Sequence, residues 1–254
     1  MSFAEREDEA YMRQLGIVRP QELPPLTIIG AGSAGSGIAV VAGKLGVRVM
    51  DIWDHDVVST HNIANQYFRG DSIGLSKVEV LKEEVERLSP IGMMPIVNIH
   101  NKAFEEGDIV DTPVVMMCVD GFDNRRSVMA TIMGADSHVD WVIDSRMSGE
   151  YYELRTIKIH NADEVAEFYK SLEGEAKEEP CTARSVIYAI MAMSSRAMLY
   201  VKKIAKGEPV PMIYSEHLGF DTMPVYRKWR SGEDIKTRLE ASSVASSVGV
   251  VQIE

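Results

Sequence analysis

The chain has 254 residues, of which 45% are hydrophobic and 26% charged, and its formal net charge is −11. This composition is ordinary for a globular protein with a substantial core, and the acidic balance argues against a nucleic-acid partner, which needs a basic face. Two cysteines, Cys118 and Cys181, are too few for a disulfide framework or a four-cysteine zinc site, which favours a cytoplasmic location. No apolar run reaches membrane-spanning length, and the acidic first residues are unlike a secretory signal, so no membrane partner is expected.

The first 24 residues predict a polar helix followed by a linker. The helix is expected from Glu5 to Leu15, and three prolines between positions 20 and 25 mark the linker. From periodicity alone, Arg13 on this helix would simply lie in solvent.

The stretch from Leu26 to Asp56 has the order strand, glycine turn, helix, strand and acid, which is the order of a nucleotide-binding βαβ unit. Its turn has the G-x-G-x-x-G pattern at positions 30–35, which lets backbone amides approach a phosphate and the helix pack closely on the strand. An acid after the second strand can accept hydrogen bonds from ribose hydroxyls. The alternative is an α/β turn that binds nothing. The candidate nucleotide-binding residues are Gly30, Gly32, Ser33, Gly35, Asp54 and Asp56.

A loop with a short helix is expected over residues 57–70, followed by a helix from Ser76 that ends before Pro90. Lys77 falls in the first turn of that helix, where a cation opposes the helix dipole. An anion nearby would explain it; the alternative is an ordinary exposed lysine.

Two further buried strands are expected at residues 94–100 and 113–119, and an apolar-periodic helix at 128–133. Cys118, inside the second strand, is expected to be an inert core residue. Asp120 follows that strand and so lies at the same rim of a parallel sheet as the glycine turn. Its carboxylate suits either a magnesium ligand or a helix N-cap.

The remaining elements are a strand at residues 139–143, an antiparallel strand at 151–160, a short helix near 165–169 and a long helix at 186–204. Cys181 precedes the long helix, where a thiol can have a lowered pKa, although buried core cysteines are more common. Residues 208–254 are compatible with docking on the domain, a subunit contact or a partner contact. The fold class is therefore α/β: a Rossmann-like, mostly parallel sheet flanked by helices and extended by antiparallel strands.

Together these motifs resemble the ThiF/MoeB/HesA family, the ubiquitin-activating type of adenylyltransferase. The resemblance covers roughly residues 10–205 and rests on several motifs in one order. They are YMRQ (11–14), GAGSAGS (30–36), DHD (54–56), NIANQ (62–66), FR (68–69), IGLSKV (73–78), CVD (118–120) and PCT (180–182).

The resemblance implies a single adenylation domain over residues 1–254, with an N-terminal helix and linker (1–24), a nucleotide-binding core (25–207) and a C-terminal extension (208–254). Its implied reaction is ATP-dependent adenylation of the C-terminal carboxylate of a small ubiquitin-like or sulfur-carrier protein, or of a peptide. ATP and Mg²⁺ are the implied cofactors, and a homodimer is the implied assembly.

The resemblance also implies residue roles. Asp54 would hold the ribose, Lys77 and Asn62 would contact the phosphates, and Asp120 would bind magnesium. Arg13 would reach into the site of the other subunit, and Cys181 would take the acyl group as a thioester. The nucleotide-binding set is completed by Asn65, Gln66 and Arg69.

Two departures from the family pattern matter. Asn65 stands where the family has an arginine, so one cation is missing unless Arg69, Arg125 or Arg126 replaces it. Paired Cys-x-x-Cys motifs are also missing, so no structural zinc is expected. Two alternative functions therefore stay open. One is a degenerate member that binds nucleotide or a partner without turnover, and the other is an NAD-dependent oxidoreductase, for which no catalytic His, Lys or Tyr is convincingly placed.

Overall fold

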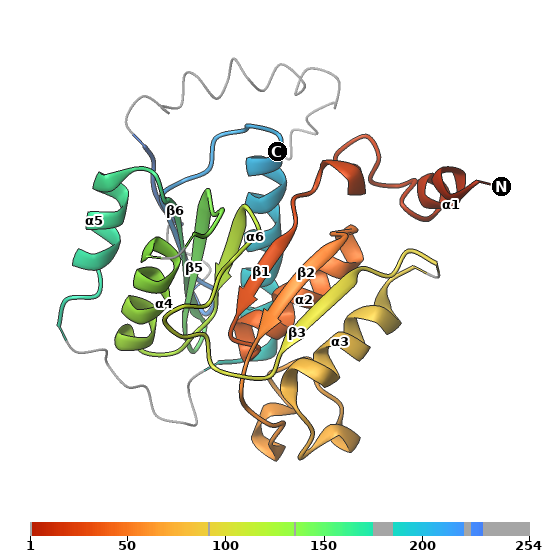
Figure 1. Ribbon diagram of the computed structural model, residues 1–254, viewed down its shortest axis with the longest axis horizontal. Coiled ribbons are helices and arrows are strands. Elements are labelled where there is room, and N and C mark those ends of the chain that lie inside the picture. Colours follow the sequence, from red (N-terminus) through yellow and green to blue (C-terminus); the bar gives the residue numbers. More distant parts are fainter. Residues whose placement is uncertain (1, 91, 135, 175–184, 221–224, 231–254) are drawn as a thin grey trace.

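The computed structural model describes residues 2–90, 92–134, 136–174, 185–220 and 225–230, and it shows one mixed sheet with helices on both faces (Figure 1). The strand order is β3-β2-β1-β4-β5-β6-β7-β8. The pairs from β3 to β5 are parallel, and those from β5 to β8 are antiparallel. The expected architecture, a mostly parallel sheet extended by antiparallel strands, is confirmed.

The described elements begin and end as follows. The strands are β1 (Leu26–Ile29), β2 (Val49–Trp53), β3 (Ile96–His100), β4 (Val114–Met117), β5 (Trp141–Ser148), β6 (Tyr151–Lys158), β7 (Ile213–His217) and β8 (Tyr226–Lys228). The α-helices are α1 (Phe3–Ala10), α2 (Ser33–Leu45), α3 (Lys77–Leu88), α4 (Phe122–Gly134), α5 (Ala162–Lys170) and α6 (Ile187–Ala205). Short 3₁₀ turns lie at Pro20–Glu22, Thr60–Asn62 and Gly70–Ser72.

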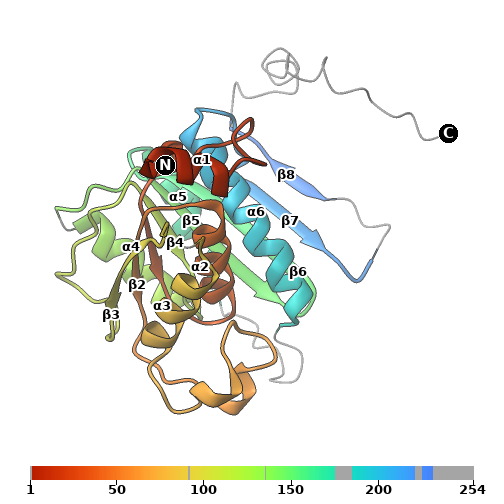
Figure 2. The ribbon, with the colours of Figure 1, turned by 90° about the vertical axis from the view of Figure 1, so that its right-hand side faces the viewer.

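Each face of the sheet has its own hydrophobic cluster, because side chains alternate along a strand. Ile28 and Ile52 point to the cluster that contains residues of α2, α3 and α6. Ile29 and Trp53 point to the cluster that contains residues of α4 and α5. Figure 2 shows α2, α3 and α6 together on one side of the sheet. The glycine turn is therefore held between two packed layers.

Helices α2 and α6 approach each other unusually closely at one point. A Cβ atom at Gly37 would lie 2.4 Å from Oγ of Ser194, so a side chain there would force Ser194 to move. Ser194 is fully buried. This contact fixes the position of α6 relative to the helix that starts at the glycine turn.

The N-terminal helix is shorter than predicted. It ends at Ala10 instead of Leu15, and the chain then turns so that Tyr11 is buried next to Gly46 at the end of α2. Glu7 accepts hydrogen bonds from Arg48 at 2.7 Å, which holds the helix against the start of β2. The helix stops at Ala10 because the next residue, Tyr11, is buried against the core, although the polar periodicity continues to Leu15.

Two other expectations were incomplete. Helix α4 begins at Phe122, because its polar first turn belongs to the helix although its apolar periodicity starts only at Val128. The region after residue 208 contributes β7 and β8, which extend the sheet beyond β6. Described residues up to Arg230 are therefore part of the same packed unit as the glycine turn.

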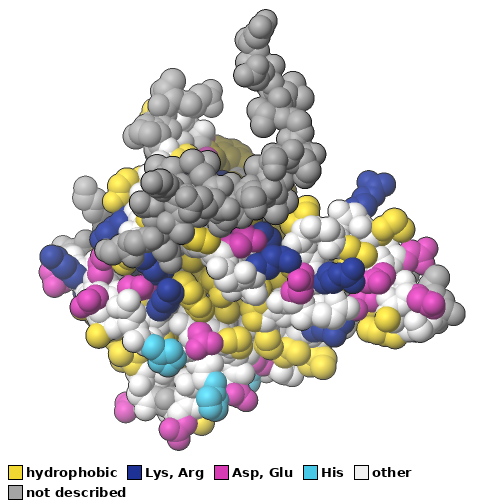
Figure 3. Space-filling model, turned by 90° about the horizontal axis from the view of Figure 1, so that it is seen from above, with side chains coloured by type: hydrophobic (Ala, Val, Ile, Leu, Met, Phe, Trp, Pro, Cys, Tyr) yellow, Lys and Arg dark blue, Asp and Glu magenta, His cyan; other side chains and the backbone are white. Residues whose placement is uncertain are grey.

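On the face seen in Figure 3, Lys and Arg side chains are interspersed with Asp and Glu and do not gather into one basic surface. No helix among the described residues is long and apolar enough to cross a membrane.

A buried ion pair secures the end of the described chain. Arg230 donates to both carboxylate oxygens of Glu164 at 2.8 Å and to the carbonyl oxygen of Val210 at 2.9 Å. Burial alone would raise the pKa of Glu164, but hydrogen bonds from Arg230 and from the Lys158 amide outweigh it and lower that pKa. Both side chains of the pair are buried, so neither can be removed alone without leaving an unpaired buried charge.

Replacing Arg230 with Met is expected to destabilise the protein by about 3–5 kcal/mol, because Glu164 would stay buried without its partner. Urea unfolding followed by circular dichroism measures this. The matched control is Lys228→Met, which removes a partly exposed pair with Glu167 and is expected to cost less than about 1 kcal/mol. Equal effects of the two changes would contradict the assignment of Arg230 as an anchor.

Candidate functional site

The amino end of α2 lacks a side-chain cap. Its N-cap residue is Gly32, which has no side chain to accept from the first amides, and the first backbone bond of the helix runs from the Ser36 amide to the Gly32 carbonyl oxygen. The amide groups before Ser36 therefore have no helical acceptor and point out of the helix end. Together with the helix dipole, they form a site suited to an anion.

Two glycines make this end possible. Gly30 has a φ of +96°, and a Cβ atom there would lie 2.6 Å from the carbonyl oxygen of Cys118. At Gly35, a Cβ atom would lie 1.8 Å from the carbonyl oxygen of Gly30. The turn between β1 and α2 is therefore as tight as the spacing of the glycines predicts, and both positions exclude a side chain.

Asp54 braces the turn from the end of β2. Its Oδ2 accepts from the Ala31 amide at 2.6 Å, and its Oδ1 accepts from the Asp56 amide at 2.8 Å. Each carboxylate oxygen can accept more than one hydrogen bond. The half-buried Asp54 carboxylate can therefore hold the turn and still accept from a ligand hydroxyl.

The anion expected beside Lys77 is Asp56. Lys77 is buried at the start of α3, and its Nζ lies 2.8 Å from Oδ2 of Asp56. The loop after β2 brings the two together, since the Lys77 amide donates to the Asp56 carbonyl oxygen at 3.0 Å. The hydrogen bond from Lys77 lowers the pKa of Asp56, despite the opposing effect of burial. The exposed-lysine alternative is therefore wrong.

Asp120 lies just after β4, the strand next to β1. Its side chain is exposed and makes no hydrogen bond or ion pair with the residues that the structure describes, while its backbone oxygen accepts from Asn124 at 3.0 Å. Helix α4 starts at Phe122, so Gly121 precedes it and Asp120 is not its N-cap. The exposed, unpaired carboxylate suits a hard cation such as Mg²⁺.

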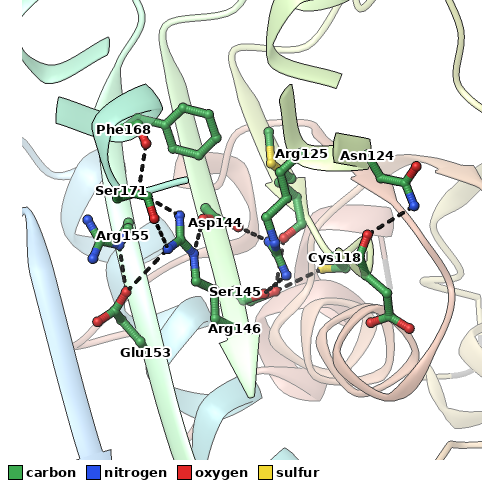
Figure 4. Close-up of polar contacts among 12 residues, drawn as sticks. Cys118, Asn124, Arg125, Asp144, Ser145, Arg146, Glu153, Arg155, Phe168 and Ser171 are labelled. Carbon is green, nitrogen blue, oxygen red and sulfur yellow. Dashed lines mark hydrogen bonds and ion pairs between the residues drawn. The ribbon is translucent and has the colours of Figure 1, made fainter. Parts of the chain in front are cut away.

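The thiol of Cys118 takes no part in such chemistry. It is buried beside β5, where Ser145 donates to its sulfur at 3.4 Å (Figure 4). Burial raises the pKa of this thiol to about 12, so it stays protonated at neutral pH. The prediction of an inert core cysteine fits this position.

The three arginines that could replace a cation at Asn65 are engaged elsewhere. Arg125 pairs with the fully buried Asp144, which Arg146 also contacts from the other side (Figure 4). Arg126 pairs with Asp123 at 2.5 Å, and Arg69 pairs with Glu84 at 2.7 Å. Each guanidinium is thus already matched to a carboxylate.

The segment from Asn62 to Gln66 covers the glycine turn. Asn62 is buried, and its Oδ1 accepts from the Ser59 amide at 2.9 Å, which shapes the loop. The amide of Tyr67 donates to Oγ of Ser36 at 3.2 Å, so the loop is tied to α2. Oε1 of Gln66 is buried without a hydrogen-bond partner among the described residues, and such an orphaned acceptor favours a donor from a ligand.

Asn65 bonds a residue that sequence analysis missed. Its side-chain amide lies 2.8 Å from Oγ of Ser185, whose hydroxyl in turn lies 3.4 Å from Oγ of Ser33 at the start of α2. Ser185 is more than 100 positions away from both along the chain, and no local pattern marks it. Only the packing of α6 on α2 reveals it.

Two predicted site residues do not lie in this group. Arg13 is exposed, and its neighbour Gln14 donates to the Leu45 carbonyl oxygen at 2.8 Å, at the far end of α2. That helix has 13 residues and is thus about 20 Å long, so Arg13 is remote from the glycine turn of its own chain. Figure 1 shows α1 at the opposite end from the segment after β2. Cys181 lies outside the described residues.

Comparisons with known proteins agree with this geometry. The family model described as "ThiF family" matches residues 25–237. The chain belongs to the ThiF family. Sequence relatives of this ThiF-family chain include ubiquitin-like modifier-activating enzyme 5 of Gallus gallus, 27% identical over 135 residues, and of Drosophila mojavensis, 24% identical over 166 residues. These matches cover 46% and 57% of this chain, and 34% and 41% of the relatives. The chain thus spans well under half of the length of the curated relatives it matches.

Solved structures share the ThiF-family fold. The selenomethionine form of PaaA aligns with a TM-score of 0.67 and 16% identity, covering 91% of this chain and 75% of that one. Escherichia coli MccB with selenomethionine MccA aligns with a TM-score of 0.68 and 15% identity, covering 90% and 74%. MccB with ATP aligns with a TM-score of 0.62 and 16% identity, covering 84% and 66%. At such identities the match concerns the fold alone.

Replacing Gly35 with Ala is expected to lower stability by about 3 kcal/mol or more, because the new Cβ atom would collide with the Gly30 carbonyl oxygen and neither backbone segment can move freely. Thermal unfolding followed by circular dichroism measures this. Gly134→Ala is the matched control, since no atom lies within 4 Å of its added Cβ, and it is expected to leave the melting temperature nearly unchanged. Equal melting temperatures for the two variants would contradict the close packing at Gly35.

Proposed function

We propose that this chain catalyses ATP-dependent adenylation of the C-terminal carboxylate of a small ubiquitin-like or sulfur-carrier protein, or of a peptide. Membership of the ThiF family supports this over the NAD-dependent reaction that a glycine turn alone would also allow. The relatives are named as enzymes that activate a ubiquitin-like modifier, and MccB has been solved with ATP and with MccA.

The observation that carries the proposal is the uncapped amino end of α2 with an acid on either side. Gly32 leaves the first amides open, Asp54 flanks them from β2, and Asp120 flanks them from β4. Since β2 and β4 both neighbour β1, their ends are about 10 Å apart. One nucleotide can thus place its ribose at Asp54 and its phosphates at the helix end.

The reaction needs positioning more than covalent help from the protein. An oxygen of the acyl carboxylate attacks the α-phosphorus, the bond to the bridging oxygen breaks, and pyrophosphate leaves with its electron pair. In this reaction, backbone amides at the start of α2 would hold the phosphates in line, and Lys77 would exchange its partner Asp56 for a phosphate oxygen. Asp120 would hold Mg²⁺, which supplies charge neutralisation when bound.

We extend the proposal to two steps that rest on sequence and topology. Cys181 would accept the acyl group as a thioester, with AMP leaving. A homodimer would complete each site with Arg13 of the other copy, which fits the position of Arg13 far from its own glycine turn. We also propose that the protein works in the cytoplasm, because a chain with only two cysteines is typical of a reducing compartment.

A second candidate is a member that binds nucleotide or a partner without turnover. Arg69, Arg125 and Arg126 are each paired with a carboxylate, which favours this candidate. Any of them would have to give up its ion pair before it could take the place of the family arginine that is missing at Asn65. ATP binding without pyrophosphate exchange would distinguish this candidate from the enzyme.

Asp120→Ala is expected to reduce ATP–pyrophosphate exchange by about 100-fold or more, since the metal would lose its protein ligand. Exchange is measured with labelled pyrophosphate and candidate carboxylate partners that end in Gly-Gly. Asp123→Ala is the matched control, because Asp123 is exposed in the first turn of α4 and pairs only with Arg126 among the described residues. Wild-type exchange in the Asp120 variant would rule out the assigned role.

Arg13→Ala is expected to be inactive alone, and mixing it with Asp120→Ala is expected to restore exchange. Random pairing gives half mixed dimers, each with one intact site, so about a quarter of wild-type activity should return. The mixture is compared with each variant at the same total concentration. No recovery after subunit exchange would show that Arg13 does not serve a neighbouring copy.

A further inference from the structure

Ser185 joins three parts of the chain at the start of α2. Its hydroxyl contacts the side chains of Ser33, on α2, and Asn65, in the loop after β2. All three are partly exposed, so a ligand at the helix end can reach them. All three are uncharged. The cations described near this site, Lys77 and Arg69, are already paired with carboxylates.

The position of Ser185 is fixed by packing on both sides. Its backbone forms a parallel bridge with Gly149 in the turn between β5 and β6. Nine residues further along the chain, on α6, Ser194 packs so closely on Gly37 that a Cβ atom there would lie 2.4 Å from its Oγ. The start of α6 is therefore held against the start of α2 from two directions.

The contacts within this group are easily exchanged. The distance of 3.4 Å between the Ser33 and Ser185 hydroxyls is long for an O–H···O bond, whose usual length is about 2.7–2.8 Å. With Oδ1 of Asn65 accepting from Ser185 at 2.8 Å, Nδ2 of Asn65 donates to the carbonyl oxygens of His61 and Asn62 at 3.2 Å. Asn65 is thus oriented by its own loop and in turn orients Ser185.

We propose that Ser185 is a nucleotide-binding residue of this chain, whose hydroxyl turns from Asn65 to donate to the β- or γ-phosphate of ATP. A hydroxyl hydrogen rotates freely, and a bond to a charged phosphate oxygen is stronger than a long bond to another hydroxyl. Neutral donors on α2 and just before α6 then hold the outer phosphates, and the inference rests on the proposed binding of ATP.

The experiment compares ATP with AMP, which lacks the β- and γ-phosphates, by isothermal calorimetry on the full chain with Mg²⁺. Ser185→Ala is expected to weaken ATP binding by about 12- to 160-fold, the effect of one hydrogen bond to a charged group, and to leave AMP binding unchanged. Ser185→Thr, which keeps the hydroxyl, is expected to restore ATP binding. Ser195→Ala, on the exposed side of α6, is the matched control and is expected to bind both nucleotides as the wild type does.

Three outcomes would overturn the inference. Unchanged ATP affinity in Ser185→Ala overturns it and leaves the proposed function intact. An equal loss of ATP and AMP affinity also overturns it, because that pattern indicates a general disturbance of the site. A wild-type chain that binds neither nucleotide overturns the proposed function, and this inference with it.

Discussion

The close contact between Gly35 and the Gly30 carbonyl oxygen is the constraint on which the rest of the site depends. It brings the first turn of α2 directly onto the end of β1, so the helix starts with its amides uncapped at the rim of the sheet. A side chain at Gly35 would push the helix away and separate the amides from Asp54. The open amides at the start of α2 and their closeness to Asp54 both depend on this contact between Gly35 and Gly30.

Charge at the rim is distributed in an unexpected way. Lys77 is matched by Asp56, and Arg69 by Glu84, so these cations are neutralised before any ligand arrives. Backbone amides, hydroxyls and side-chain amides remain as donors, and the Asp120 carboxylate remains exposed without a partner among the described residues. Neutral donors avoid the desolvation penalty of burying an unpaired cation and still bind a phosphate well. The missing family arginine at Asn65 fits this pattern.

The antiparallel half of the sheet also contributes to the site, although it lies away from the glycine turn. Strands β5 and β6 supply the turn at Gly149, which pairs with the backbone of Ser185. Strands β7 and β8 widen the surface beneath α6, and the Arg230–Glu164 pair secures their end. Helix α6 thus rests on this half of the sheet where it meets α2, and a change in this half would reach the start of α2.

The family, the mostly parallel sheet and the glycine turn with Asp54 could all be predicted from the amino-acid sequence, because they depend on local order: apolar runs, glycine spacing and an acid at a strand end. Other features became visible only in the folded chain. Lys77 pairs with Asp56, and Arg69 and Arg125 pair with carboxylates. The region after residue 208 adds two strands, and Ser185 contacts Ser33. Each of these features depends on which surfaces pack together. Contacts between side chains far apart in the sequence produce no periodic pattern from which they could be predicted. Of these, only the contact between Ser185 and Ser33 follows from the packing of α6 on α2.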